Sequence, residues 1–252
     1  MPNNKHNKHI KGLKLILLLL STLLPFGYLL SQNTSTPVSS NIVKSELDKL
    51  YGVDQRLVSG DFYSGAPLGS VSGHPYFFDE TWKEGSVTIE GIKYNNLLLK
   101  FDVASDMLVL KTYTLNNNTI QLCLKKEKIS GFTMNEAKFI RFPDENKSKK
   151  IVFAQLCSEG NVDFLLVRNK VMTITNGGDS DFIYKEYFQN YLRYNGQFIK
   201  FNNKKTLYNL FPEYKPALKK YLSQNNLSTS KKDTHNLTML VDYCNSLLNN
   251  SK

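Results

Sequence analysis

Two apolar runs separated by a short polar break occupy residues 93–114, KYNNLLLKFDVASDMLVLKTYT. In the first run, apolar side chains recur at every second position: Leu97, Leu99, Phe101 and Val103. Successive side chains of a strand point to opposite faces, so this spacing predicts a strand that buries one face. The residues between them, Leu98, Lys100 and Asp102, are expected on the other face. The second run, 107–114, is rich in β-formers and is expected to pair with the first, and a hairpin needs neighbouring strands to be stable in water.

Further short apolar or alternating runs follow at roughly ten-residue intervals. They lie at 120–124, 136–142, 151–157, 162–168 and 171–175, with polar segments between them. Asn195-Gly196 separates two more apolar runs and is the residue pair typical of a type I′ turn. Strands at this spacing predict an antiparallel β-meander over residues 73–201, either a curved sheet or a barrel-like one.

The hydrophobic period changes from two to helical spacing at about residue 204. Leu207, Phe211 and Leu218 belong to one such stripe, interrupted by two prolines, and 237–248 forms a second. Asp233 or Thr234 is the expected N-cap of the last helix. We therefore predict an α+β protein whose C-terminal amphipathic helical segment, 204–248, packs on the sheet.

The first 31 residues have the pattern of a secretory signal peptide. Lysines at 5, 8, 11 and 14 precede an apolar run of 16 residues, 15–30. As a helix this run would reach ~24 Å, less than the ~30 Å hydrocarbon core of a bilayer. Cleavage after Ser31 would leave Gln32 first, and retention as an uncleaved membrane anchor is the alternative. Residues 32–72 are predicted to be a flexible leader followed by a Gly- and Ser-rich loop.

The formal net charge is +10, and much of it lies in the C-terminal quarter. Residues 185–233 hold ten Lys or Arg against three acidic residues. A candidate basic patch consists of Lys215, Lys219, Lys220, Lys231 and Lys232. Such a patch could attract phosphates or anionic lipid head groups, whereas the alternative is a solvated face of the helices.

Four aromatic residues fall within seven positions just before the strand at 86–90: Tyr76, Phe77, Phe78 and Trp82. One interpretation is a platform that binds sugar or lipid. The other is a cap on the end of the sheet, because each ring buries a large apolar area.

Cysteine, histidine and acidic residues give no definite site. Cys123, Cys157 and Cys244 form an odd set without a CxxC pair, so one disulfide or three small buried hydrophobes are both consistent. We expect no metal site and no cofactor. Nucleophile-elbow, zincin and dinucleotide-binding motifs are absent, and catalysis would have to use His74 or an unmarked pair among the 22 acidic residues.

Three stretches together resemble a family of exported β-rich proteins of the Gram-negative cell envelope that has no assigned activity. They are TWKEGSVTIEGIKYNNLLLKFDVASDMLVL at 81–110, YLRYNGQFIKFNNKKTLYNLFPEY at 191–214 and DTHNLTMLVDYCNSLL at 233–248. The resemblance implies location and architecture only, because its motifs are strand, turn and helix patterns. No functional residue follows from it.

These observations favour an exported protein, of the periplasm or cell envelope or secreted, that acts as a binding or structural module. Its expected partner is another envelope protein or surface component and not nucleic acid. Contact with a membrane would involve only an uncleaved N-terminus or the basic helical face. The alternatives are a β-barrel carrier of a small apolar ligand and a hydrolase that uses a carboxylate pair.

Overall fold

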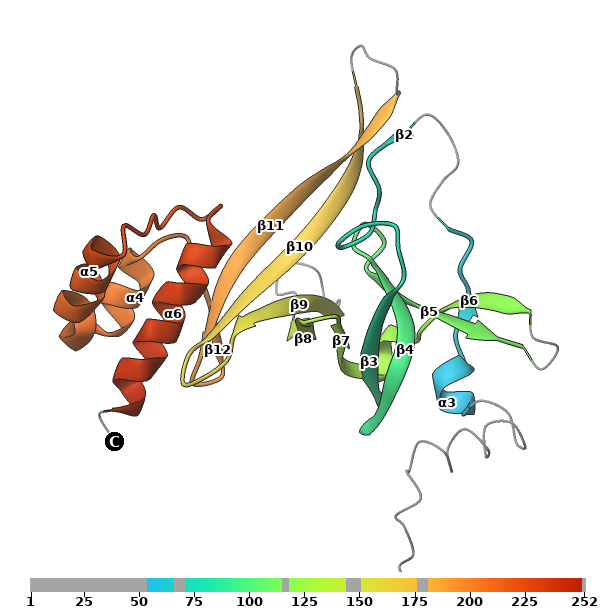
Figure 1. Cartoon of the computed structure of the whole chain (residues 1–252), viewed down its shortest axis with the longest axis horizontal. Helices are drawn as coiled ribbons and strands as arrows, with labels where there is room; N and C mark the ends of the chain where they lie inside the picture. Colours follow the sequence, from blue (N-terminus) through green and yellow to red (C-terminus); the bar gives the residue numbers. More distant parts are fainter. Residues whose placement is uncertain (1–53, 66–70, 115–117, 144–150, 176–180, 251–252) are drawn as a thin grey trace, which may run out of the picture. The chain divides into compact units, whose positions relative to one another are not determined.

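The computed structural model describes residues 54–65, 71–114, 118–143, 151–175 and 181–250 (Figure 1). The predicted signal peptide and most of the predicted flexible leader lie outside these residues. The strands are β1 (Asp61–Phe62), β2 (Val71–Ser72), β3 (Lys83–Ile89), β4 (Ile92–Asp102), β5 (Met107–Tyr113), β6 (Thr119–Cys123), β7 (Ile129–Met134), β8 (Ala137–Pro143), β9 (Ile151–Ser158), β10 (Asp163–Ile174), β11 (Phe182–Tyr194) and β12 (Gln197–Lys200). The helices are α3 (Gln55–Val58), α4 (Lys205–Leu210), α5 (Lys215–Gln224) and α6 (Thr234–Asn249), with 3₁₀ turns η1 (Lys126–Lys128) and η2 (Pro212–Tyr214).

The described strands form one open sheet with the order β1-β6-β5-β4-β3-β7-β8-β9-β10-β11-β12. It consists of two antiparallel meanders, β3 to β6 and β7 to β12, joined where β3 pairs with β7. β2 adds a parallel pairing to β11, so the sheet is mixed. The α+β class and a curved sheet are confirmed. A single continuous meander is not, and the sheet does not close into a barrel.

The sheet curls around a first apolar cluster on one face. Phe101 of β4 and Phe153 of β9 have ring centroids 6.3 Å apart although three strands separate them. Four strand spacings in a flat sheet would place them ~19 Å apart. Phe132 and Phe139 stack between them, with centroids 4.5 Å apart. The predicted strand face of Leu99, Phe101 and Val103 is buried in this cluster, as expected.

The sheet curls in the opposite sense further along. Phe142 of β8 lies 4.6 Å from the ring of Tyr191 on β11 and 4.8 Å from that of Phe198 on β12. Ala154 of β9 belongs to this second cluster, whereas its neighbour Phe153 belongs to the first. Adjacent residues of a strand point to opposite faces, so the two clusters lie on opposite faces of one sheet.

The C-terminal helices cover the other side of this second curl. α6 packs on β9 and β10, and its residues Leu237, Leu240 and Val241 are fully buried (Figure 1). They belong to a third cluster with Phe164 of β10 and Leu192 of β11. Within the predicted C-terminal helical segment, α6 is thus the helix that packs on β9 and β10. Asp233 is the N-cap of α6, where its carboxylate accepts a hydrogen bond from the backbone N–H of Asn236.

Two turns have positive φ at both central residues, and the sequence predicted the one at Asn195-Gly196. Glu90 and Gly91 connect β3 to β4, and Asn195 and Gly196 connect β11 to β12. Both turns have positive φ at both central positions, as a type I′ turn requires.

The sequence analysis missed one strand, and two of its expectations were wrong. β7 was not predicted, because Gly131 interrupts its alternation and weakens the strand signal. The polar residues 168–170 were expected to separate two strands, whereas β10 runs through them without a break as one 12-residue strand. The Gly- and Ser-rich region was expected to be irregular, yet β1 pairs with β6 and β2 pairs with β11.

Gly85 explains part of the junction between the two meanders. It lies in β3 opposite Met134 of β7, next to a register shift in the pairing with β4. A Cβ at this position would overlap the carbonyl oxygen of Thr133 and press on Leu99. Only glycine allows the backbones of β3 and β7 to approach this closely.

Candidate functional site

The four predicted aromatic residues lie at one end of the first cluster and do not form a single surface. The segment before β3 is held to β4 by backbone hydrogen bonds from Phe77 N to Phe101 O and from Val103 N to Pro75 O, both 2.9 Å. Tyr76 and Phe77 are buried, whereas Phe78 is 50% exposed. The ring of Phe77 packs edge-on against that of Phe139, with centroids 4.9 Å apart. This placement agrees with the capping interpretation for two of the four rings.

Lys100 lies between two of these aromatic rings. Its Nζ is 4.4 Å from the ring centroid of Tyr76 and 4.6 Å from that of Trp82. Burial lowers the pKa of Lys100 from its ordinary value, and the acidic residues nearby act in the opposite direction. The Lys100 amine already occupies one face of the Tyr76 ring and one face of the Trp82 ring. A sugar or lipid could not stack on those two faces. Within the predicted aromatic cluster, Phe78 is the residue with the largest exposed ring surface.

A buried polar network adjoins the aromatic segment. The Asp102 side chain is only 3% exposed, and its carboxylate accepts hydrogen bonds from Tyr63 Oη at 2.9 Å and from Ser105 N at 2.9 Å. Tyr63 Oη also lies 3.3 Å from Tyr76 Oη. Burial raises the pKa of Tyr63 far above its ordinary value, so its hydroxyl remains a donor. The expectation that Asp102 faces water was wrong, because residues 63 and 76 cover that end of β4.

His74 does not meet the partners that a catalytic role would require. Its Nδ1 is buried and has no hydrogen-bond partner among the described residues. Burial and the nearby Lys170 lower the pKa of His74, so the imidazole is neutral at pH 7. Lys170 Nζ donates to the backbone carbonyls of His74 at 3.1 Å and Tyr76 at 2.5 Å. Asp79 is held instead by Thr81 and Lys83 within its own turn.

All members of the predicted basic patch are exposed: Lys215, Lys219, Lys220, Lys231 and Lys232. The first three belong to α5, and the other two precede α6. The backbone carbonyl of Lys231 accepts a hydrogen bond from Asn190 Nδ2 at 2.9 Å, which ties the segment before α6 to β11. The lysine side chains lie outside the helical cluster, as the sequence predicted.

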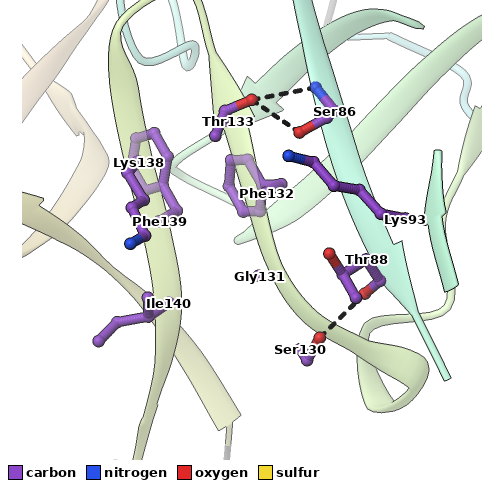
Figure 2. A pocket seen from close by; sticks show the side chains of 10 residues that line it. All are labelled: Ser86, Thr88, Lys93, Ser130, Gly131, Phe132, Thr133, Lys138, Phe139 and Ile140. Carbon is purple, nitrogen blue, oxygen red and sulfur yellow. Dashed lines mark hydrogen bonds between the residues drawn. The ribbon is translucent and has the colours of Figure 1, made fainter. Parts of the chain in front are cut away.

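Figure 2 shows a depression of about 220 Å³ on the sheet face opposite the first cluster. β3, β7 and β8 supply most of its lining. Hydroxyl groups and two amines face it, from Ser86, Thr88, Ser130, Thr133, Lys93 and Lys138. The Ser86 and Thr133 hydroxyls are bonded to each other at 2.9 Å, and Lys138 pairs with Glu159 at 2.7 Å. Several of the polar groups that line the depression therefore already have hydrogen-bond or ion-pair partners within the protein.

The three cysteines are free thiols on β6, β9 and α6. Cys123 lies on β6 and Cys157 on β9, with five strands between them in the sheet, so these two cysteines are not neighbours across adjacent strands. Burial raises the pKa of Cys157 to about 11 and that of Cys244 to about 12. A thiol with such a pKa is protonated at neutral pH and is a poor nucleophile.

Within the described ranges, no group of three or more His, Cys, Asp and Glu side chains has an arrangement that could hold a metal ion. In the same part of the chain, no helix is both long enough and apolar enough to cross a bilayer. Comparisons of the chain with protein-family models, curated proteins and solved structures found no significant match in any of the three sets.

Proposed function

We propose that the protein is an exported, non-enzymatic binding module of the cell envelope. We further propose that it contacts another envelope protein through the outer part of the β10–β11 hairpin, residues 168–174 and 182–188, called here the distal hairpin. The observation that carries this proposal is the exposure of large apolar side chains on these two strands. The export step rests on the lysine-rich start and the apolar run of the first 31 residues.

The distal hairpin exposes five of the nine large apolar side chains that the described residues leave open to solvent. Ile174 is 73% exposed and Tyr187 54%, and three more are between 37% and 40%: Val171, Met172 and Phe182. Contiguous apolar patches are uncommon on monomeric proteins and mark interaction surfaces. The register places Met172 opposite Tyr184 and Ile174 opposite Phe182, so one face carries two adjacent apolar pairs.

The strand edges favour a protein over a lipid as the partner. β9 pairs with β10 only as far as Val167, and β12 pairs with β11 only over its last four residues. Among the described residues, the outer edge of β10 beyond Val167 has no strand beside it (Figure 1). Unpaired backbone N–H and C=O groups can pair with an added strand of another protein, and a hydrocarbon phase would leave them unsatisfied.

The alternative functions have less support. A carrier of the lipocalin type requires a closed sheet around an apolar lumen, whereas the described sheet is open and its face clusters are filled by side chains. The buried carboxylates Asp102 and Asp163 are each engaged inside the protein, the first by Tyr63 and the second by Arg193 at 2.7 Å. Neither is free to act as the acid or base of a hydrolase.

The test is crosslinking in the envelope with matched variants. Met172→Ser/Ile174→Ser removes the apolar pairs of one face, and Tyr113→Ser is the control because Tyr113 is 52% exposed on β5, outside the hairpin. We expect one crosslinked partner to be captured by the wild type and by Tyr113→Ser but lost with the double variant, at an unchanged melting temperature. Equal capture by all three proteins would contradict the proposal.

Export is tested separately by fractionation and N-terminal sequencing. We expect the chain in the envelope fraction to begin near Gln32. A chain that stays in the cytoplasm would contradict the proposed location. An envelope chain that begins at Met1 would instead identify the first segment as an anchor.

A further inference from the structure

A second hollow lies among the C-terminal helices and shares no residue with the distal hairpin. It has a volume of about 500 Å³ and is bordered by the start of α4, the last turns of α5 and the residues after α5. Its polar lining residues are Lys204, Tyr208, Lys219, Ser223, Asn226 and Ser228. Leu222 and Leu227 complete the lining described here.

The end of α5 shapes this hollow. Asn226 has φ of +51°, a left-handed conformation that asparagine tolerates well. Leu227 N donates to Leu222 O at 3.1 Å, the six-to-one bond that ends a helix in a Schellman motif. The chain therefore reverses at Asn226, and Ser228 returns to the side on which Ser223 and Lys219 lie.

The charge of the lining is entirely positive. Lys204 and Lys219 are exposed, and none of the described ion pairs includes either of them. No aspartate or glutamate is among the residues that border the hollow. Lys215 adds a further positive charge nearby, with its Nζ 5.9 Å from the ring centroid of Tyr208. The local field thus favours a negatively charged group.

Tyr208 contributes an unused donor at the same place. The residue is 7% exposed, and its hydroxyl is buried without a hydrogen-bond partner among the described residues. Buried polar groups almost always have partners, so an exception of this kind needs an explanation. Burial also raises the pKa of Tyr208, which keeps the hydroxyl protonated and able to donate.

We propose that this hollow, called the α4–α5 site, binds a compact oxyanion such as a phosphate or sulfate monoester. Two lysine amines would supply the charge, and the exposed Ser223 and Ser228 hydroxyls would donate hydrogen bonds to the oxygens. The Tyr208 hydroxyl is covered in the free protein and would donate to the anion once its neighbours shift on binding. Charge-assisted hydrogen bonds of this type are the strong ones in proteins. The site is independent of the distal hairpin, so each can fail without the other.

The test is a titration of the purified full chain with sodium phosphate and sodium sulfate, against sodium chloride at matched ionic strength. Amide chemical shifts of residues 223–228 report occupancy. We expect saturable shifts with phosphate or sulfate and none with chloride. Tyr208→Phe removes only the hydroxyl and should weaken binding about tenfold, as should Lys219→Gln. Lys232→Gln removes the same charge outside the site and should bind like the wild type.

Although Tyr208→Phe should weaken anion binding, it should not destabilise the free protein. Because the hydroxyl has no partner, the variant should melt at the same temperature as the wild type or higher without anion, yet gain less from added phosphate. The proposal is overturned if no anion binds saturably, if Tyr208→Phe binds as well as the wild type, or if Lys232→Gln weakens binding as much as Lys219→Gln does.

Vesicles identify the source of the anion. Phosphatidylcholine vesicles with and without phosphatidic acid are compared, because phosphatidic acid presents a phosphate monoester at a lipid surface. Binding to phosphatidic acid that is lost in Tyr208→Phe would assign a lipid head group. Binding of free phosphate without vesicle binding would assign a soluble phosphorylated ligand, and vesicle binding unchanged in both Tyr208→Phe and Lys219→Gln would count against the site.

Discussion

The distal hairpin and the rest of the β10–β11 hairpin, residues 163–167 and 189–194, called here the proximal half, share one backbone pairing. They differ in the elements that pack on them. Their register continues without a shift from Asp163 opposite Arg193 to Ile174 opposite Phe182. In the proximal half, Phe164, Leu165 and Leu192 are fully buried. In the distal half, Ile174 is 73% exposed.

The difference arises from what covers each half. α6 lies on one face of the proximal half, and the curl toward β8 and β12 covers the other face with Phe142 and Phe198. Neither cover extends to the distal half, whose other contacts include the short β2 and, through Lys170, the backbone of His74 and Tyr76. Strand pairing alone thus fixes register but not burial, and burial supplies most of the stability. Four experiments follow from this contrast, in order of decreasing expected effect.

The largest effect is expected from a phenylalanine pair matched across the two halves. Phe164→Ala should lower the free energy of unfolding by about 3–5 kcal/mol, because the ring is fully buried against Phe201 with centroids 5.4 Å apart. Phe182→Ala, at a site 37% exposed in the distal half, should cost less than about 1 kcal/mol. Urea unfolding followed by circular dichroism measures both. Equal losses would remove the distinction between the halves.

The second experiment breaks the link between α6 and the proximal half. Asn245 accepts a hydrogen bond from Val162 N and donates one to Val162 O, both at 2.8 Å, in a buried setting. Asn245→Ala leaves both backbone groups unsatisfied and should cost about 2–3 kcal/mol. Asn225→Ala removes an exposed bond to Tyr221 O and should change the unfolding free energy by less than about 0.5 kcal/mol. If Asn245→Ala also lowered the unfolding free energy by less than about 0.5 kcal/mol, Asn245 would not be what holds α6 to the sheet.

The third experiment uses alkaline pH to test whether the Cys244 thiol of α6 is buried over the proximal half. Burial under the helices raises the pKa of Cys244 to about 12, so the folded protein keeps the thiol proton at pH values where the unfolded chain, with an ordinary pKa near 9.0, has lost it. This contribution is fully present below about pH 8.5 and is lost as pH rises, by about 1.4 kcal/mol per pH unit, until pH approaches the folded pKa. Between pH 9 and 11 the wild type should therefore lose stability more steeply than Cys244→Ala. Parallel pH profiles would show that the thiol is not buried.

The smallest effect is expected at the centre of the distal half. Val171→Thr keeps the β-branched shape at a site 40% exposed and should change the unfolding free energy by less than about 0.5 kcal/mol. Thermal melting of the variant beside the wild type measures this. A loss above about 1.5 kcal/mol would show that Val171 is covered in solution, which would itself indicate self-association of the hairpin.

Local patterns predicted most of the elements. The Asn195-Gly196 turn, the alternation of Leu99, Phe101 and Val103, and the N-cap at Asp233 were all visible in the sequence. β7 was missed because Gly131 disrupts its pattern. The uninterrupted course of β10 was missed because Arg168, Asn169 and Lys170 are polar, and a short polar run between apolar segments resembles a turn.

The candidate sites were less predictable than the elements. The basic patch contains Lys219, which does border the α4–α5 site, but Lys204 and Tyr208 were not singled out. Tyr208 looks like an ordinary member of an apolar helical stripe, and its missing hydrogen bond exists only when α4 and α5 are packed together. Similarly, nothing near Asp102 in the sequence indicates that Tyr63 will bury it.

Local sequence patterns were sufficient to place most of the strands, helices and tight turns, because side-chain periodicity, capping and positive-φ residues act over a few neighbouring positions. Only the packed fold shows that β3 pairs with β7, that the curl of the sheet reverses at β8 and β9, and which half of the β10–β11 hairpin is covered. These outcomes depend on contacts between residues far apart in the chain, whose energies are set by the packed surroundings and not by the local pattern.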